Sequence, residues 1–328
     1  MNMDLITPQD EQIIHQWSVR QTTQALLNIA NSDGSASKKL AHFCDEFKEL
    51  APQVKIRNAK DDPFRTPAII IGRHGNIAYQ AIPEGKELPP FLEALSAAAK
   101  NAESPSDKIS PATLIELPAE LSVFIAQQCP HCPNIVSQLL SLADENPPLR
   151  LAVIDGFLFD KQAKAQDIRS VPTLILDNEL RWTGQINIRE VIRQCVQRDP
   201  SQLSAASLRQ IIEAGEAARV ATMMGTNNQI FPAFINLLVH ERWSVRLGAM
   251  VTVEYLADES PDLAARLIAL LIKCFAGLDA PVQGDMVQVL AQLKSKDVKE
   301  YLEKITSGNY AESVREAAEE ELETWPND

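Results

Sequence analysis

The 328-residue sequence has little cysteine, no visible export signal and no long apolar run. Its five cysteines, Cys44, Cys129, Cys132, Cys195 and Cys274, are too few, and odd in number, for a disulfide-stapled secreted domain. The N-terminus, MNMDLITPQDEQ, has neither a basic stretch nor an apolar core, so no signal peptide is visible. No run reaches the roughly 20 apolar residues that cross a bilayer. We therefore expect a soluble, cytoplasmic protein that does not enter the membrane.

Basic surplus and glycine-rich phosphate loops are also missing. The net charge of −13 argues against nucleic acid, which requires a basic face. No Gly-x-Gly-x-x-Gly occurs, so neither a flavin nor a nicotinamide domain is visible, and we expect no bound cofactor. Gly72-Arg73-His74-Gly75 is interpreted as a hairpin turn and not as a phosphate loop.

The sequence is long enough for two or three domains, and its apolar content of 45% can fill real cores. The polar stretch Glu103–Asp107 and the Asp199-Pro200-Ser201 turn are the predicted boundaries, giving parts 1–105, 106–200 and 201–328. Residues 201–328 carry 11 basic and 19 acidic residues, so most of the acidity lies in the last part.

A Cys-x-x-Cys pair lies in the middle part, within Phe124–Val136 (FIAQQCPHCPNIV). An apolar strand is predicted before it and a helix after it. The hydrophobic pattern predicts further elements in the order β-α-β-α-β-β-α. The expected strands are Thr113–Glu116, Leu121–Ala126, Leu149–Ile154, Leu174–Leu176 and Arg181–Ile186, and the expected helices are Ile135–Asp144, Asp160–Ile168 and Ile188–Arg198. A Cys-x-x-Cys beside such a βαβ pattern is typical of thioredoxin-like redox proteins.

Thiol chemistry explains this placement. A cysteine at a helix N-terminus faces unsatisfied backbone N–H groups, which stabilise the nucleophilic thiolate. We therefore expect Cys129 to be the exposed attacking thiol and Cys132, one turn on, to be the buried resolving thiol. Pro130 suits the first helical turn, where its missing N–H costs nothing. His131, when protonated, would stabilise the thiolate and make the disulfide easier to reduce.

Val171-Pro172-Thr173 is expected to face the two cysteines. A cis Val171–Pro172 bond would leave the amide and carbonyl of Val171 free to pair with an extended substrate, as in strand addition. Val171, Thr173 and Pro130 are therefore the predicted substrate-binding residues, and Pro172 belongs to the predicted catalytic set.

Other interpretations of the cysteine pair remain open. A lone Cys-x-x-Cys can form half of a zinc site, although zinc usually takes four ligands and no second pair or histidine group accompanies it here. The pair could also be inert and buried, and His131 could be a solvated loop residue. Cys44, Cys195 and Cys274 lie inside predicted helices and are expected to be small core residues.

Several motifs resemble one family more closely. Cys129-Pro-x-Cys132, Ile154-Asp155-Gly156, Leu158-Phe159 and Ile168-x-x-Val171-Pro172-Thr173 resemble the N-terminal domain of the flavoprotein subunit of bacterial alkyl hydroperoxide reductase. Archaeal protein disulfide oxidoreductases have a similar arrangement. The resemblance covers about 200 residues and implies two tandem thioredoxin folds, only the second of which has cysteines. In the first part it matches expected strands at Gln53–Arg57, Ala68–Ile71 and Asn76–Ile82 and a helix at Phe91–Lys100, with no cysteine near Asn31–Ser37.

The same resemblance gives a role to Glu87. In that family an acidic residue at this position leans over the dithiol from the first fold, where it would take the proton of Cys132. Ordinary thioredoxins place a buried aspartate where this sequence has Val123, and a tryptophan where it has Gln128. Glu87 could instead be a solvated loop charge. The Pro-His insert resembles that of strongly oxidising disulfide oxidases, so the direction of electron flow stays open.

The last part contains a recurring segment. Trp243–Met250, Ala280–Val287 and Glu312–Glu319 share apolar spacing, with Ser-Val-Arg in the first and third. Periods of this size predict stacked helical hairpins, and these residues resemble HEAT repeats. A plain helical bundle is the alternative. Such arrays bind proteins, and the acidic surplus favours a basic partner or simply solubility.

The sequence thus predicts an α/β thioredoxin-like region of two tandem thioredoxin folds, followed by an all-α HEAT-like helical repeat domain. The leading hypothesis is a cytoplasmic disulfide reductase. It uses a redox-active Cys129–Cys132 disulfide, receives electrons from a separate reductase, and docks its protein client on the helical domain. The resemblance suggests a peroxiredoxin as client. A redox-sensitive adaptor without turnover, or a disulfide oxidase or isomerase, is the alternative.

Overall fold

The computed structural model describes residues 5–59, 67–72, 74–103 and 115–325, without the side chains of residues 101–103. The chain divides into two compact units, residues 1–197 and residues 198–328, which are described separately. The sequence placed this division after residue 200, within the turn that contains Pro200.

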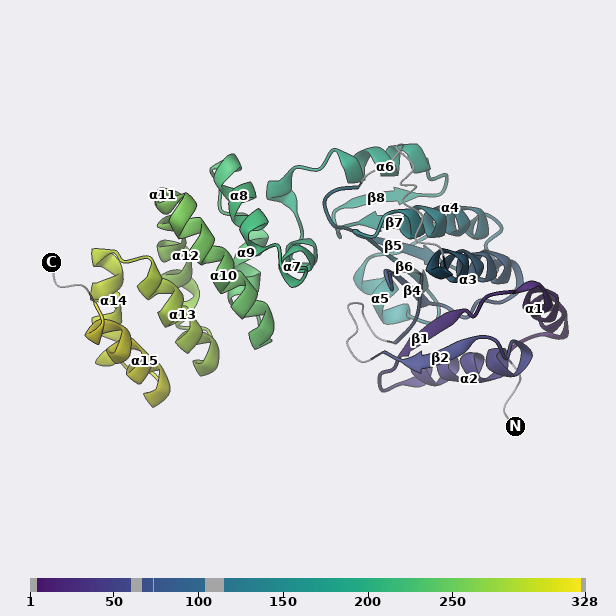
Figure 1. Ribbon diagram of the computed structural model, residues 1–328, viewed down its shortest axis with the longest axis horizontal. Helices are drawn as coiled ribbons and strands as arrows, with labels where there is room; N and C mark the ends of the chain where they lie inside the picture. Colours follow the sequence, from purple (N-terminus) through teal and green to yellow (C-terminus); the bar gives the residue numbers. More distant parts are fainter. Residues whose placement is uncertain (1–4, 60–66, 73, 104–114, 326–328) are drawn as a thin grey trace. The chain divides into compact units, whose positions relative to one another are not determined.

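The first unit is built on one eight-stranded sheet with the order β2-β1-β3-β4-β6-β5-β7-β8 (Figure 1). Each strand is four to seven residues long. The strands are β1 (Leu26–Ala30), β2 (Lys55–Asn58), β3 (Ala68–Ile71), β4 (Ile77–Gln80), β5 (Ala119–Ile125), β6 (Leu149–Asp155), β7 (Thr173–Leu176) and β8 (Leu180–Thr183).

The two halves of this sheet have the same pairing pattern. In the first half β1 runs parallel to β2 and antiparallel to β3, and β3 runs antiparallel to β4. In the second half β5 stands in the same relation to β6 and β7, and β7 to β8. Strands β4 and β6 join the halves in parallel, with Ile77 opposite Leu151. The predicted boundary after residue 105 therefore does not separate two compact units, because backbone pairing continues across it.

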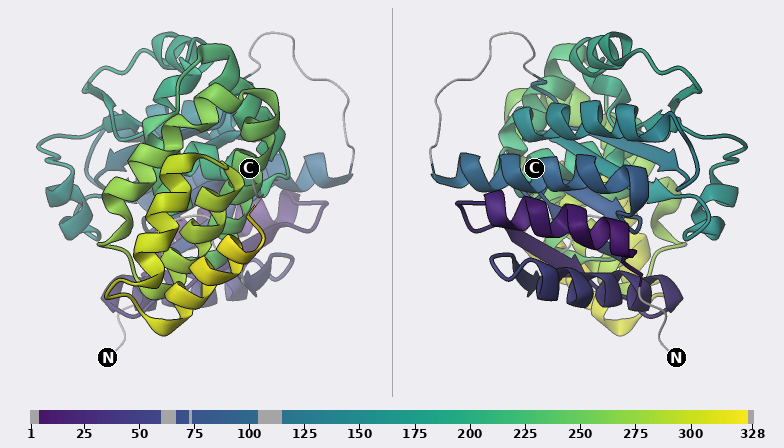
Figure 2. Two further views of the ribbon diagram at one scale, coloured as in Figure 1. Left: turned by 90° about the vertical axis from the view of Figure 1, so that its left-hand side faces the viewer. Right: turned by 90° about the vertical axis from the view of Figure 1, so that its right-hand side faces the viewer.

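Helices cover the sheet on both faces. The helices of this unit are α1 (Pro8–Arg20), α2 (Ser35–Leu50), a 3-10 turn η1 (Gly85–Glu87), α3 (Leu88–Glu103), α4 (Cys132–Glu145), α5 (Asp160–Ala165) and α6 (Ile188–Val196). Helices α1, α3 and α4 lie side by side (Figure 2, right). Side chains from α2, α3, α4 and α6 share one core with alternate residues of the strands, and α5 packs through Ala163 on the opposite face.

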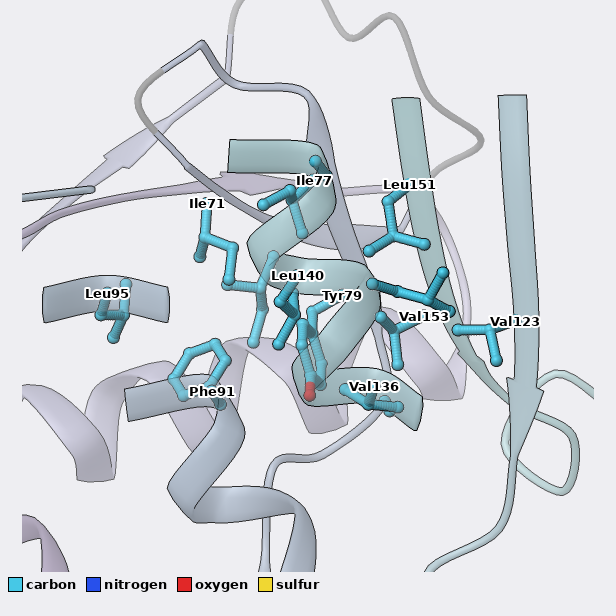
Figure 3. Packing of buried hydrophobic residues seen from close by; sticks show 14 of the residues in the cluster. Ile71, Ile77, Tyr79, Phe91, Leu95, Val123, Val136, Leu140, Leu151 and Val153 are labelled. Carbon is cyan, nitrogen blue, oxygen red and sulfur yellow. The ribbon is translucent and has the colours of Figure 1, made fainter. Parts of the chain in front are cut away.

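Hydrophobic periodicity explains why these segments form helices and strands. On α4, Ile135, Val136, Leu139 and Leu140 recur at helical spacing and are all buried. On β5, Leu121 and Val123 enter the main core while Phe124 belongs to the cluster on the other face, as the two-residue period of a strand requires. Figure 3 shows this packing around β4, α3 and α4.

One predicted strand is wrong. Ile115 and Glu116 are not in a strand, and residues 113–114 lie outside the described residues. The remaining predicted elements of the middle part are present with ends shifted by a few residues, which is usual for sequence patterns. The β7–β8 turn contains Asp177 and Asn178 with φ of +51° and +63°, a conformation that Asp and Asn tolerate and that suits tight hairpins.

Every regular element among the described residues of the second unit is a helix or a 3-10 turn. Its elements are a 3-10 turn η2 (Pro200–Gln202), α7 (Ala205–Glu213), α8 (Ala217–Asn227), α9 (Pro232–Leu238), α10 (Trp243–Glu259), α11 (Pro261–Ala264), α12 (Arg266–Phe275), α13 (Ala280–Gln292), α14 (Lys296–Thr306) and α15 (Glu312–Glu323).

Each recurring segment of the sequence begins a helix of this unit. These helices, α10, α13 and α15, pack in succession, α10 on α13 and α13 on α15, and each also contacts the helix before it (Figure 1). Their equivalent valines, Val245, Val282 and Val314, are all buried. In the part of the chain that the structure describes, no helix combines the length and apolarity that crossing a membrane would require.

Candidate functional site

Cys129 and Cys132 lie where β5 gives way to α4. The Cys129 side chain is partly exposed, whereas Cys132 is fully buried, and no disulfide joins them. The backbone N–H of Cys132 donates to Cys129 Sγ at 3.2 Å. Cys132 is the first residue of α4, so this amide is one of the unpaired donors at the positive end of the helix. The arrangement would stabilise negative charge on the Cys129 sulfur.

The start of α4 differs in detail from the prediction. The helix begins at Cys132, so Pro133 and not Pro130 occupies its first turn. Pro130 is exposed in the loop before the helix, and exposed His131 is the N-cap residue. The sequence pattern did not distinguish these registers, because both prolines fit a helix start.

Val171 lies across from Cys129. Its peptide bond to Pro172 is cis, and Cys129 Sγ lies 3.8 Å from the Val171 carbonyl oxygen, to which the thiol can donate. The Pro172 carbonyl is already engaged, because it accepts from the Gly184 amide at 3.0 Å. Within the described residues the Val171 amide makes no hydrogen bond, so it is available to an incoming backbone.

Thr173 does not fit its predicted role as a substrate contact. Its side chain is buried, and its hydroxyl donates to the Ser170 carbonyl at 2.8 Å and lies 3.2 Å from the Thr183 hydroxyl. Thr173 is also paired with strands on both sides. The residue therefore braces the Val171–Pro172 segment from inside, out of reach of a client.

A groove of about 700 Å³ opens beside these groups. Its walls come from the loop at the start of α4, the cis-proline segment and the chain between β8 and α6. It is lined by Pro130, His131, Asn134, Ile135, Gln138, Val171, Pro172, Gly184, Gln185, Ile186 and Asn187. An extended peptide in this groove would pass over the backbone amide of Val171.

Glu87 reaches this region from the first half of the unit. It ends the 3-10 turn η1, which packs against α4. Two contacts fix that loop. The Asp10 carboxylate accepts from the Gly85 amide at 3.2 Å, and Gln127, two residues before Cys129, donates to the Glu84 carboxylate. Asp10 and Gln127 were missed at the sequence level, since only their distant partners reveal their roles.

Burial decides the electrostatics of Glu87. Its side chain is 2% exposed, and neither carboxylate oxygen has a hydrogen-bond partner among the described residues. Burial raises the pKa of Glu87 to about 7. Burial, the contact with Cys129 and the charge of Glu87 together raise the pKa of the Cys132 thiol. A carboxyl that titrates near neutrality therefore lies close to the thiol that is harder to ionise, and it is not a solvated loop charge.

The remaining cysteines are not part of the Cys129–Cys132 pair. Cys44 in α2 and Cys195 in α6 are buried core residues, as predicted, and burial raises the pKa of Cys44 to about 12. Cys274 in α12 is half-buried and its thiol donates to the Leu271 carbonyl. Among the described side chains, no group of three or more His, Cys, Asp or Glu residues is placed to hold a metal ion.

Comparison with known proteins supports a thioredoxin-like fold for the second half of the first unit. A family model described as a thioredoxin domain matches residues 119–197. Curated relatives include an NADH dehydrogenase of Ferdinandcohnia aciditolerans, 26% identical over 196 residues, and an alkyl hydroperoxide reductase subunit of Xanthomonas campestris pv. phaseoli, 22% identical over 204. The matches cover 58% and 60% of this chain but 37% and 38% of the relatives. The chain thus spans little more than a third of the length of these relatives.

Two solved structures are similar to the first unit. One is an N-terminal domain of alkyl hydroperoxide reductase from Enterococcus faecalis, with 20% identity and a TM-score of 0.48, covering 57% of this chain and 98% of that one. The other is a protein disulfide oxidoreductase from Aeropyrum pernix, with 14% identity and a TM-score of 0.47, covering 58% and 94%.

Proposed function

We propose that the chain is a thiol–disulfide oxidoreductase that works as a cytoplasmic protein disulfide reductase through Cys129 and Cys132. One observation carries this proposal: a partly exposed cysteine sulfur receives the first free amide of a helix, with a buried second cysteine one turn away. The relatives that are alkyl hydroperoxide reductase subunits, and the thioredoxin domain over residues 119–197, support a thiol–disulfide oxidoreductase.

The proposed reaction has two displacements. The Cys129 thiolate attacks a disulfide of the client, forms a mixed disulfide, and releases one client sulfur as a thiolate. Cys132 then gives its proton to Glu87 and attacks Cys129 Sγ, which forms the Cys129–Cys132 disulfide and releases the second client sulfur. The client gains two electrons and the dithiol loses two. A dithiol supplied by a separate reductase restores the reduced pair.

The rest of the proposal concerns the client. The amide and carbonyl of Val171 would pair with the client backbone in the groove, the carbonyl once Cys129 has given up its proton. Both halves of the first unit would be thioredoxin folds, of which the first supplies Glu87. The helical unit would be a HEAT-like array on which the client protein docks. The names of the relatives favour a peroxiredoxin-type client.

Single-cysteine variants test the assignment. Cys129→Ser should abolish reduction of a model protein disulfide such as insulin, because the attacking sulfur is gone. Cys132→Ser should instead accumulate a mixed disulfide, visible on a non-reducing gel. Cys274→Ser, which removes the half-buried thiol of the helical unit, is the matched control and should react like the wild type. Full turnover by Cys129→Ser would refute the proposal and favour an adaptor.

The reduction potential separates a reductase from an oxidase, which the Pro130-His131 insert leaves as the second candidate. Equilibration with glutathione buffers should give a value near that of thioredoxin, about −270 mV. A value near −120 mV would make the pair an oxidant.

A further inference from the structure

Two buried polar groups near the dithiol lack a partner. The Tyr79 hydroxyl on β4 and both carboxylate oxygens of Glu87 are inaccessible and make no hydrogen bond with any described residue. Buried polar groups in folded proteins are almost always paired, since an unpaired group loses its hydration without compensation. The burial of two unpaired polar groups in the same unit therefore requires an explanation.

The surroundings of Tyr79 leave its hydroxyl few choices. Its ring packs edge to face on Phe91 of α3, with ring centroids 5.2 Å apart. Phe91 lies one helical turn after Glu87. Every other side chain labelled in Figure 3 is a hydrocarbon, including Val136 and Leu140 of α4. The hydroxyl is thus enclosed by apolar residues between β4, α3 and α4, and both of these helices also pack against the η1 turn.

The electrostatics agree with this geometry. Burial, and after it the charge of Glu87, hold the pKa of Tyr79 well above its ordinary value. The hydroxyl therefore stays protonated through neutral pH, where it can donate one hydrogen bond. An ionised carboxylate in an apolar site needs such a donor more than the neutral acid does.

We propose that Tyr79 is a positioning residue for Glu87, whose carboxylate accepts a hydrogen bond from the Tyr79 hydroxyl, directly or through one water molecule, as Cys132 loses its proton. This inference rests on the proposed function and adds to it the group that holds the base. Tyr79 counteracts part of the effect of burial, so a larger fraction of the carboxyl is ionised at neutral pH. Without this donor, a smaller fraction of Glu87 would be ionised and able to accept the proton of Cys132.

Other titratable groups near Glu87 belong to three elements. The charge of Glu87 raises the pKa of Cys132 on α4 and that of Tyr79 on β4, in both cases after the larger effect of burial. Glu84 lies three residues before it in the same loop, where burial, then the charge of Asp10, and more weakly that of Asp155, raise its pKa. The test must therefore separate the titration of Glu87 from that of Glu84.

Stopped-flow reaction of the full-length reduced protein with dithiobis-nitrobenzoate isolates the attack by Cys132 from the attack by Cys129. Attack by Cys129 releases the first thionitrobenzoate, and attack by Cys132 on the mixed disulfide releases the second. In Tyr79→Phe, which keeps the ring, the pH midpoint of the second phase should rise by about one unit. Near neutral pH that shift slows the second phase about fivefold, and the first phase is unchanged. Tyr301→Phe in the helical unit is the matched control.

A double-mutant cycle distinguishes positioning from general structural damage. Glu87→Gln should slow the second phase about 100-fold, and adding Tyr79→Phe should then change nothing. The Tyr79→Phe shift should persist in Glu84→Gln. Should Tyr79→Phe fail to fold, fluorotyrosine incorporation, which strengthens the donor, should lower the midpoint instead.

An unshifted midpoint in Tyr79→Phe, or an equal slowing by Tyr79→Phe in the presence and absence of Glu87, would overturn the positioning role and leave the proposed function intact. Loss of the biphasic reaction in the wild type, or a normal first phase in Cys129→Ser, would overturn the proposed function itself.

Discussion

The Glu87 carboxyl links protonation at the site to the stability of the fold. An acid whose pKa is raised by folding binds its proton more tightly in the folded chain. Its contribution is fully favourable below its unfolded pKa of about 4.5 and is lost as the pH rises through about 7. This stabilising contribution is thus reduced at neutral pH, the range in which the proposed reaction needs a base beside Cys132.

Glu87→Gln tests that linkage at the residue scale. Between about pH 5 and about pH 8 the wild type should lose about 2 to 3 kcal/mol of unfolding free energy more than the variant, because glutamine does not ionise. Urea unfolding of both reduced proteins measures this difference. Parallel pH dependences in the two proteins would show that Glu87 ionises as an ordinary surface carboxyl. Glu93→Gln, on the adjoining helix α3, is a control that should leave the pH dependence unchanged.

His131 is the second residue whose role can be measured. It is exposed at the N-cap of α4, between the two cysteines, so solvent screens its charge. If the protonated ring stabilises the Cys129 thiolate, His131→Ala should lower the reduction potential by about 30 mV, a tenfold change in the exchange equilibrium. His15→Ala on α1 is the control. Equal potentials in all three proteins would identify His131 as a solvated loop residue.

At the scale of elements, polar contacts reinforce the repeated helices of the second unit. Arg246, at the start of α10, donates to Asp285 of α13 at 2.5 Å and to the His240 and Glu241 carbonyls before its own helix. Gln283 occupies the equivalent position of α13 and donates to the Phe275 carbonyl before that helix. In α10 and α13 the recurring segment therefore repeats a side-chain contact with the chain before the helix, as well as a buried valine.

Arg246→Ala should destabilise the helical unit by about 3 kcal/mol, because it leaves Asp285 and two carbonyls without a partner. Arg246 is 4% exposed and Asp285 18%. Arg209→Ala, which breaks the more exposed Arg209–Glu213 pair, should cost less than about 1 kcal/mol. Thermal unfolding followed by circular dichroism compares the two variants. Equal losses would mean that the Arg246 contacts contribute no more than a surface pair.

At the scale of the molecule, the continuous sheet places the chemistry in one unit. Both cysteines of the Cys-x-x-Cys pair, the Val171 segment and Glu87 all lie within residues 1–197. Pairing of β4 with β6 ties the half that has Glu87 to the half that has the cysteines. Neither half is complete without the other, since an exposed β4 or β6 would present an unpaired edge.

A fragment of residues 1–197 should therefore fold and reduce a small disulfide at a rate within about twofold of the full chain, because a compact unit with its own core can fold alone. Reduction of a protein client should fall if the helical unit docks it. Both the fragment and the full chain are assayed beside their Cys129→Ser variants, which measure the background reduction. A folded but unreactive fragment would show that the helical unit takes part in the chemistry.

Local pattern was enough to predict much of this protein. A Cys-x-x-Cys between an apolar strand and a helix indicated the thioredoxin-like region. The hydrophobic periods of strands and helices can be recognised from residues that are close together in the sequence. The same reasoning found the strands at Leu174–Leu176 and Arg181–Ile186 and the recurring helical segments at Trp243, Ala280 and Glu312. It went wrong at Thr113–Glu116, and it placed Pro130 in the first turn of the helix that Pro133 occupies.

Only the tertiary structure decided the rest. That the first 197 residues form one sheet depends on pairing between β4 and β6, whose nearest ends, Gln80 and Leu149, are far apart in sequence and have no local signal for each other. The burial of Glu87, the contact of Asp10 with Gly85 and the closeness of Tyr79 to Glu87 likewise depend on segments that meet only in the folded chain. Sequence determines which side chains are available and which elements they form. Long-range packing determines which of them are buried together, and that burial raises the pKa values of both Glu87 and Cys132.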